Sequence, residues 1–194
     1  MTRTIRIGIL GLAALLACAG AARAQGAADE DWGMGRPASF GVGGGVSMPV
    51  SDAADAYGTG WVLHGFVRLN EAGLPFGVRM DLDYHSFDLD PDLGVSGSTG
   101  VFAALGEAEF DLSRSSALRS YGLAGLGAYF TTTNALGGSS TDVNLGLNLG
   151  GGAQFRIGSQ LAFLEARIDY IFTDEGRVTP DSIQLIPVTF GLVF

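Results

Sequence analysis

Residues 188–194 read VTFGLVF, so this segment of the chain closes on an aromatic side chain. Successive side chains of an extended strand point to opposite sides. One face of the segment and of the two residues before it therefore holds Ile186, Val188, Phe190, Leu192 and Phe194. That face is wholly apolar, and the segment predicts a strand with one side covered by a protein core or by lipid.

The N-terminal residues have the pattern of a secretory signal peptide. Arg3 and Arg6 precede an apolar stretch that runs from Ile7 to about Ala22, and Ala22-Arg23-Ala24 offers small residues for signal peptidase. We expect cleavage after Ala24, so that residues 1–24 are removed and residues 25–37 form a short periplasmic segment. A competing interpretation is a lipoprotein site at Leu15-Leu16-Ala17-Cys18, with Cys18 lipidated.

The charge of the exported chain excludes several function classes. Beyond residue 24 it has eight Arg, no Lys and 20 acidic residues, a net charge of −12. This balance argues against nucleic acid or an anionic membrane surface as an electrostatic partner. The only Cys lies within the signal, so the exported chain has no disulfide, thiol nucleophile or Cys-based metal site.

Period-two alternation recurs from Ala38 to the end, in segments close to the roughly 9–11 residues of a tilted membrane-spanning strand. The predicted strands are 39–48, 61–70, 78–85, 102–112, 121–131, 144–157, 164–172 and 183–194. Long connections are expected at 50–59, 88–100, 132–143 and 173–182, and short ones at 71–75, 113–118 and 158–160. Residues 38–194 thus predict an all-β, eight-stranded antiparallel up-and-down barrel with both ends at the short-turn end.

The orientation of the two faces follows from the aromatic residues. A soluble barrel would place its apolar faces inside, but the lumen of an eight-stranded barrel is too narrow to hold many aromatic side chains. The aromatics towards the ends of the apolar faces are what two membrane-interface girdles would need. They are Trp61, Tyr84, Phe110, Tyr121, Tyr129, Tyr170, Phe172 and Phe194. We therefore expect a transmembrane barrel with lipid outside and charge inside.

Three stretches, GVGGGVSMPV…YGTGW, GLNLGGGAQFRI and LEARIDYIF, together with the terminal aromatic strand, resemble the outer-membrane β-barrel domain family, the small OmpA/OmpX-type barrels often labelled porin-family proteins. The resemblance implies the outer membrane of a Gram-negative-type bacterium. It also implies that the barrel-assembly machinery reads Ile186, Val188, Phe190, Leu192 and Phe194. Relatives often carry Gly-Asp-Phe after the first strand's Pro, whereas Pro49 precedes Val50-Ser51-Asp52-Ala53. No second domain follows, so the peptidoglycan-binding role of larger relatives is not expected.

The charged faces predict a network inside the barrel, formed by Arg68, Arg79, Asp81, Asp83, Glu107, Glu109, Asp111, Arg156, Glu165, Arg167 and Asp169. Hairpin geometry places Arg79 near Glu107 and Glu109, with the residues from 165 to 169 as a second group. Charges removed from water must be paired, which favours a structural plug. The alternative is a narrow cation-preferring path, because four Arg face seven acids in this set.

Catalytic and metal sites find little support. His64 and His85 suggest the hypothesis of a lipid A-modifying enzyme. Ser86, however, points away from its neighbour His85, and no other Ser stands out as a partner for a Ser–His pair. We therefore expect both His side chains to make luminal hydrogen bonds instead. Asp88-Leu89-Asp90-Pro91-Asp92 resembles half of a calcium loop, yet Leu93 and Thr99 replace the needed Gly and Glu. We expect no catalytic residue, cofactor or metal ligand.

Together these features predict a monomeric outer-membrane barrel without enzyme activity and with a structural or surface-interaction role. A narrow channel is the second interpretation and a lipid A enzyme the third. The expected partners are outer-membrane lipid, lipopolysaccharide and the assembly machinery, and nucleic acid is excluded. The acidic loops suit lipopolysaccharide because divalent ions bridge its molecules. The polar, Gly- and Ser-rich loops could form a binding surface but identify no ligand.

Overall fold

The computed structural model describes residues 37–55, 57–69, 74–88, 97–115, 117–135, 138–173 and 182–194. The expected signal peptide, including Cys18, and nearly all of the expected segment 25–37 lie outside the described residues. Most of the candidate calcium loop also lies outside them. No helix in the described part of the chain is long and apolar enough to cross a membrane.

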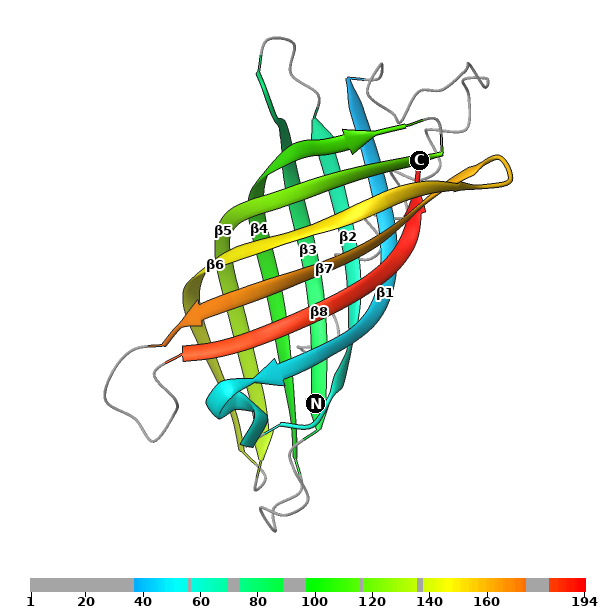
Figure 1. Cartoon of the computed structure of the whole chain (residues 1–194). Coiled ribbons are helices and arrows are strands. Elements are labelled where there is room, and N and C mark those ends of the chain that lie inside the picture. The colour runs from blue at the N-terminus through cyan, green and yellow to red at the C-terminus, as the bar shows by residue number, and fades with distance from the viewer. Residues whose placement is uncertain are drawn as a thin grey trace.

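A closed barrel of eight antiparallel strands accounts for the described chain (Figure 1). Each strand pairs with the next, and β8 pairs with β1, which confirms the predicted up-and-down barrel. A short 3-10 helix, η2 (Ser51–Asp55), follows the first strand. The strands are β1 (Ala38–Val50), β2 (Gly60–Leu69), β3 (Gly77–Asp88), β4 (Gly97–Arg114), β5 (Leu118–Ala135), β6 (Gly138–Ile157), β7 (Gln160–Phe172) and β8 (Ser182–Val193).

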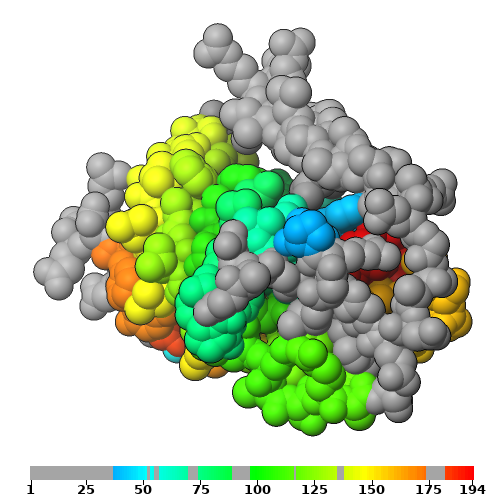
Figure 2. All heavy atoms as spheres, turned by 90° about the horizontal axis from the view of Figure 1, so that it is seen from above, coloured from blue at the N-terminus to red at the C-terminus, as the bar shows by residue number. Residues whose placement is uncertain are grey.

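The two ends of the barrel differ. The β6–β7 turn and the C-terminal end of β8 lie at one end, which we call the turn end (Figure 1). Gly158 in this two-residue turn has a φ of 62°, a conformation that residues with a side chain rarely adopt. The helix η2, the end of β7 and the start of β8 lie at the opposite end, which we call the loop end. Figure 2 shows this end in space-filling form, with parts of the start (blue), middle (green) and end (red) of the described chain visible from it.

One predicted connection is wrong. Residues 132–143 were expected to be a long loop, but β5 and β6 remain paired as far as Ala135 and Gly138. Residues 97–101 of β4 join the same sheet. A Gly-, Ser- and Thr-rich stretch resembles a loop in composition, yet Thr favours strands, and here Thr132 Oγ1 and Thr141 Oγ1 share a hydrogen bond of 3.0 Å. We call residues 97–101, 131–135 and 138–142 the β4–β6 extension.

Most side chains face the side that alternation predicts. Large apolar residues are exposed on the outside, such as Met80 and Phe172, while the charges between them are buried. Tyr121 and Tyr129 are exceptions: both were expected in the aromatic girdles, but they point inwards and are 1% and 0% exposed. The inner face of β5 is as small and apolar as its outer face, so alternation gave no direction for this strand.

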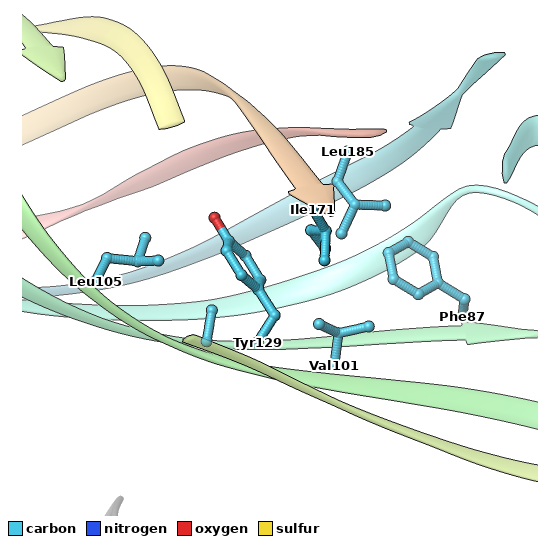
Figure 3. Close-up of a cluster of buried hydrophobic side chains, with 7 residues drawn as sticks. Phe87, Val101, Leu105, Tyr129, Ile171 and Leu185 are labelled. Atoms are coloured by element: carbon cyan, nitrogen blue, oxygen red, sulfur yellow. The ribbon is translucent and has the colours of Figure 1, made fainter. Parts of the chain in front are cut away.

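Buried side chains of different kinds lie at different heights in the lumen. At the loop end, a cluster of buried apolar side chains lies inside the barrel, and Figure 3 shows it. A second cluster, of Phe66, Phe163 and Val193, lies near the turn end. The charged side chains occupy the space between the two clusters and extend towards the turn end. The loop-end cluster consists of Phe87, Val101, Ala103, Leu105, Tyr129, Ile171 and Leu185.

Candidate functional site

Arg79 on β3 is the centre of the luminal charge network. Its side chain is fully buried, and its Nε and Nη2 donate hydrogen bonds of 2.8 and 2.7 Å to Asp81. Nη1 and Nη2 also donate bonds of 2.7 and 2.9 Å to Glu165, which lies on β7 at the opposite side of the barrel. Glu107 and Glu109 approach the same guanidinium to 3.7 and 3.5 Å, as the hairpin geometry predicts. Arg79 therefore connects β7 with β3 and β4 across the lumen.

Arg167 on β7 reaches across the lumen to carboxylates on β3 and β4. Its Nη1 donates to Asp81 Oδ2 at 2.8 Å and to Glu107 Oε1 at 3.3 Å, and its Nη2 pairs with Asp83. The prediction of a separate group around Glu165 and Arg167 is therefore wrong. Side chains from strands that are four apart reach each other because an eight-stranded barrel is narrow. The charges of β3, β4 and β7 form one network.

Arg119 on β5 holds the network at the turn end, although the sequence analysis missed it. It donates to Glu109 Oε1 at 2.5 Å, to Asp111 Oδ1 at 2.6 Å and to Gln154 Oε1 at 3.1 Å. Arg68 donates to the same Glu109 oxygen at 3.0 Å. The predicted strand begins at residue 121, three residues after the start of β5 at Leu118. If the predicted strand had begun two residues earlier, alternation would have placed Arg119 on its inner face.

Two predicted members lie at or beyond the rim of the network. Asp111 is exposed and pairs with Arg114 as well as with Arg119. Arg156 is exposed near the end of β6, so it does not belong to the buried set. Alternation predicts the inner side for Arg156, but this position lies only two residues before the turn at Gly158.

Asp169 differs from the other buried carboxylates. It is fully buried, yet neither of its side-chain oxygens accepts a hydrogen bond from a described residue. The guanidinium of Arg167, two residues away on the same face, is turned towards Asp81 and Asp83. Among the described residues, six buried carboxylates face four buried guanidinium groups, which are Asp81, Asp83, Glu107, Glu109, Glu165 and Asp169 against Arg68, Arg79, Arg119 and Arg167.

A possible metal site in the network is occupied by Arg79. The ligand atoms of His64, Asp81 and Glu165 lie within 4.8 Å of one another. Arg79 Nη2 lies among them, at 3.2, 2.7 and 2.9 Å. His64 Nδ1 lies 2.6 Å from Asp83, so a neutral imidazole with its proton on Nδ1 satisfies both of its contacts. The guanidinium takes the place of a cation at this site.

The second histidine makes a short contact with a serine, but no triad. His85 Nδ1 lies 3.0 Å from Ser47 Oγ, and both residues are fully buried. The other ring nitrogen of His85 has no hydrogen-bond partner among the described residues. A serine hydrolase needs an acid at that position and a serine that substrate can reach. Ser86, which precedes Phe87 on β3, does not make this contact.

A family model for the outer membrane protein beta-barrel domain matches residues 11–194. The chain belongs to this family. Membership in the outer membrane protein beta-barrel family places the chain in the bacterial outer membrane. No curated protein matches the chain in sequence.

Several solved structures of bacterial surface and outer membrane proteins share this fold. The Neisserial surface protein A aligns with a TM-score of 0.62 at 14% identity, covering 81% of this chain and 96% of its own. A major outer membrane protein from Thermus thermophilus aligns with a TM-score of 0.57 at 15% identity, covering 81% and 98%. Ail, the attachment invasion locus protein of Yersinia pestis, aligns with a TM-score of 0.51 at 17% identity, covering 81% and 97%.

Proposed function

We propose that this outer membrane barrel is a closed, monomeric scaffold without enzyme activity, with a role in envelope structure and in contacts made by its loop end. The observation that carries the proposal is the pair of guanidinium bridges, from Arg79 to Glu165 and from Arg167 to Asp81, that span the lumen. Both arginines are buried, with 0% and 3% of their surface exposed. Long arginine side chains held on several carboxylates fill the lumen instead of lining an open path.

The apolar clusters also support a closed lumen over a channel. An ion entering from the loop end would meet Phe87, Val101 and the side chains packed with them before it reached a charged group. Ala53 of η2 is fully buried, and Tyr57 packs against this cluster. An ion in such a layer loses its water without gaining a ligand, which costs far more than thermal energy. In barrels of this type the longer loops face the exterior, so this layer faces outwards.

Planar-bilayer conductance tests the proposal. The refolded chain without residues 1–24 is first shown to be a compact barrel by its shift in gel mobility on boiling. We expect no discrete conductance steps from this folded protein, because no hydrated path connects the two ends. Cation-selective steps that disappear in the Glu107→Gln/Glu109→Gln variant would overturn the closed scaffold and establish the narrow channel.

Export and assembly complete the proposal. The signal peptide is cleaved after Ala24, and the assembly machinery recognises the outward face of β8. Phe190 on this face is 48% exposed, and the ring of Phe194 stacks on Phe40 of β1 with centroids 5.3 Å apart. Lipid and lipopolysaccharide surround the assembled barrel.

The Phe194→Ala variant tests recognition by the assembly machinery. In cells, we expect several-fold less heat-modifiable protein in the outer membrane, whereas refolding of the purified chain changes little. Phe172→Ala, which removes another outward Phe (47% exposed) from β7, is the control and should assemble normally. Equal assembly of both variants and the unchanged chain would contradict recognition through Phe194.

A further inference from the structure

The outer wall of the barrel has a groove that the closed lumen does not explain. It has a volume of about 390 Å³ and lies on β5, β6 and β7. Ala124 and Gly125 contribute little bulk to it, while Leu147, Leu149 and Ile168 border it with side chains that are 50–65% exposed. The groove is therefore apolar and open to the lipid-facing side of the barrel.

A continuous row of outward side chains leads from this groove to the loop end. The β5–β6 register pairs them across the two strands, and their chemistry changes along the row. Leu126, Leu145 and Val143 are 61–68% exposed, and then the side chains become hydroxyls and amides. From the groove outwards the pairs are Ala124 with Leu149, Leu126 with Leu147, Ala128 with Leu145, Phe130 with Val143, Thr132 with Thr141, and Asn134 with Ser139. We call this row the β5–β6 track.

The apolar part of the track has the height of one membrane leaflet. Leu149 and Val143 are six residues apart on β6, or about 20 Å at roughly 3.4 Å per residue. At a strand tilt of about 40° this is about 15 Å along the membrane normal, half of the roughly 30 Å hydrocarbon core. An acyl chain that begins at Phe130 and Val143 would therefore end in the groove near the middle of the membrane.

The polar part of the track favours sugar over phosphate. It offers the hydroxyls of Thr132, Thr141 and Ser139 and the amide of Asn134, which donate and accept hydrogen bonds as sugar hydroxyls do. No Lys or Arg occurs between residues 120 and 155, so a phosphate headgroup would find no cationic partner on β5 or β6 there. Phe102 and Phe130, with ring centroids 6.0 Å apart, mark the boundary between the two parts.

We propose that the β5–β6 track binds one outer-leaflet lipid, with an acyl chain in the groove and an uncharged sugar headgroup on the outer face of the β4–β6 extension. The groove is continuous with the lipid-facing wall, so membrane lipid reaches it directly. This binding site is additional to the closed scaffold and does not depend on the state of the lumen.

Native mass spectrometry of the barrel released from nanodiscs tests this site. The nanodiscs contain phosphatidylglycerol, phosphatidylethanolamine and diglucosyl diacylglycerol in equal amounts and with the same acyl chains. We expect one retained lipid per barrel, with the diglucosyl lipid favoured at least fivefold over either phospholipid. No retained lipid, equal retention of the three, or a preference for a phospholipid would overturn the proposal, and so would a dimer peak in place of the lipid adduct.

Two pairs of variants separate the acyl site from the headgroup site. Ala124→Phe fills the groove and should abolish retention of every lipid, whereas Val46→Phe, at an exposed position on β1, should leave it unchanged. Thr132→Val/Thr141→Val should keep one lipid but lose the preference for sugar. The matched control is Thr99→Val/Thr133→Val, a hydroxyl pair 3.3 Å apart on the inner face of the same extension, which should keep the preference.

A second test arm adds lipid A, which carries phosphates on its sugars, to the same nanodiscs. Preference for lipid A over the diglucosyl lipid when both are present would overturn the uncharged headgroup. Retention that Ala124→Phe leaves intact would overturn the acyl site in the groove.

Discussion

Replacing Arg79 by Ala is expected to lower the free energy of unfolding by about 3–5 kcal/mol, because breaking a buried ion pair leaves the remaining charge without compensation. Asp81 and Glu165 would each lose two hydrogen bonds from this guanidinium. Both carboxylates are at most 2% exposed, so water does not replace those bonds without opening the barrel. The packing of the guanidinium 4.0 Å from the ring centre of Phe66 would also be lost.

Urea unfolding in lipid vesicles, followed by tryptophan fluorescence and by gel mobility without boiling, measures this loss. The control is Arg114→Ala, which removes the ion pair with Asp111 at the rim. Arg114 has a side chain that is 45% exposed, and exposed pairs contribute only about 0–1 kcal/mol. An Arg79→Ala barrel that unfolds at the same urea concentration as the unchanged protein would contradict a structural role for the network.

Replacing Gly45 by Ala is expected to weaken closure of the barrel by about 3 kcal/mol, at the upper end of the usual overpacking cost. Gly45 on β1 lies opposite Thr189 in the pairing with β8. A Cβ atom on Gly45 would overlap the carbonyl oxygen of Val188. That oxygen belongs to the backbone of the neighbouring strand, so the methyl group fits only if the β1–β8 pair separates locally.

Gly106→Ala is the matched control for Gly45→Ala at the β1–β8 pairing, which we call the β1–β8 seam. Gly106 lies on the outer face of β4, and a Cβ atom there would have no atom within 4 Å beyond its two chain neighbours. This variant should fold with the yield and the urea midpoint of the unchanged protein, while Gly45→Ala should lose folded, heat-modifiable barrel. Equal folded yields and midpoints for the two variants would show that the β1–β8 seam tolerates a side chain.

The sequence predicted those parts of the network that depend on neighbouring strands. Alternation along residues 78–85 assigns Arg79 to the inner face, and antiparallel pairing with the next strand brings it beside Glu107. Both steps use only the period of a strand and the pairing of adjacent strands. The buried position of Arg79 and its approach to Glu107 confirm this reasoning.

The contacts across the lumen could not be predicted in the same way. Glu165 meets Arg79 because the shear and the diameter of the closed barrel bring β7 opposite β3, and alternation within a strand contains neither quantity. The inward positions of Tyr121 and Tyr129 were missed for a local reason. Glycines and alanines alternate with leucines and tyrosines along β5, so both faces look apolar and the charge of Arg119 lay outside the predicted strand.

A double-mutant cycle between Arg79 and Glu165 tests most directly whether charges across the lumen hold the walls of this barrel together. Arg79→Met, Glu165→Gln and the double variant are compared by urea unfolding in vesicles. The two residues share hydrogen bonds of 2.7 and 2.9 Å, so we expect a coupling free energy of about 1–3 kcal/mol, in the range found for residues in one buried network. Single effects that add to within about 0.3–0.5 kcal/mol, as they do for independent sites, would contradict the account.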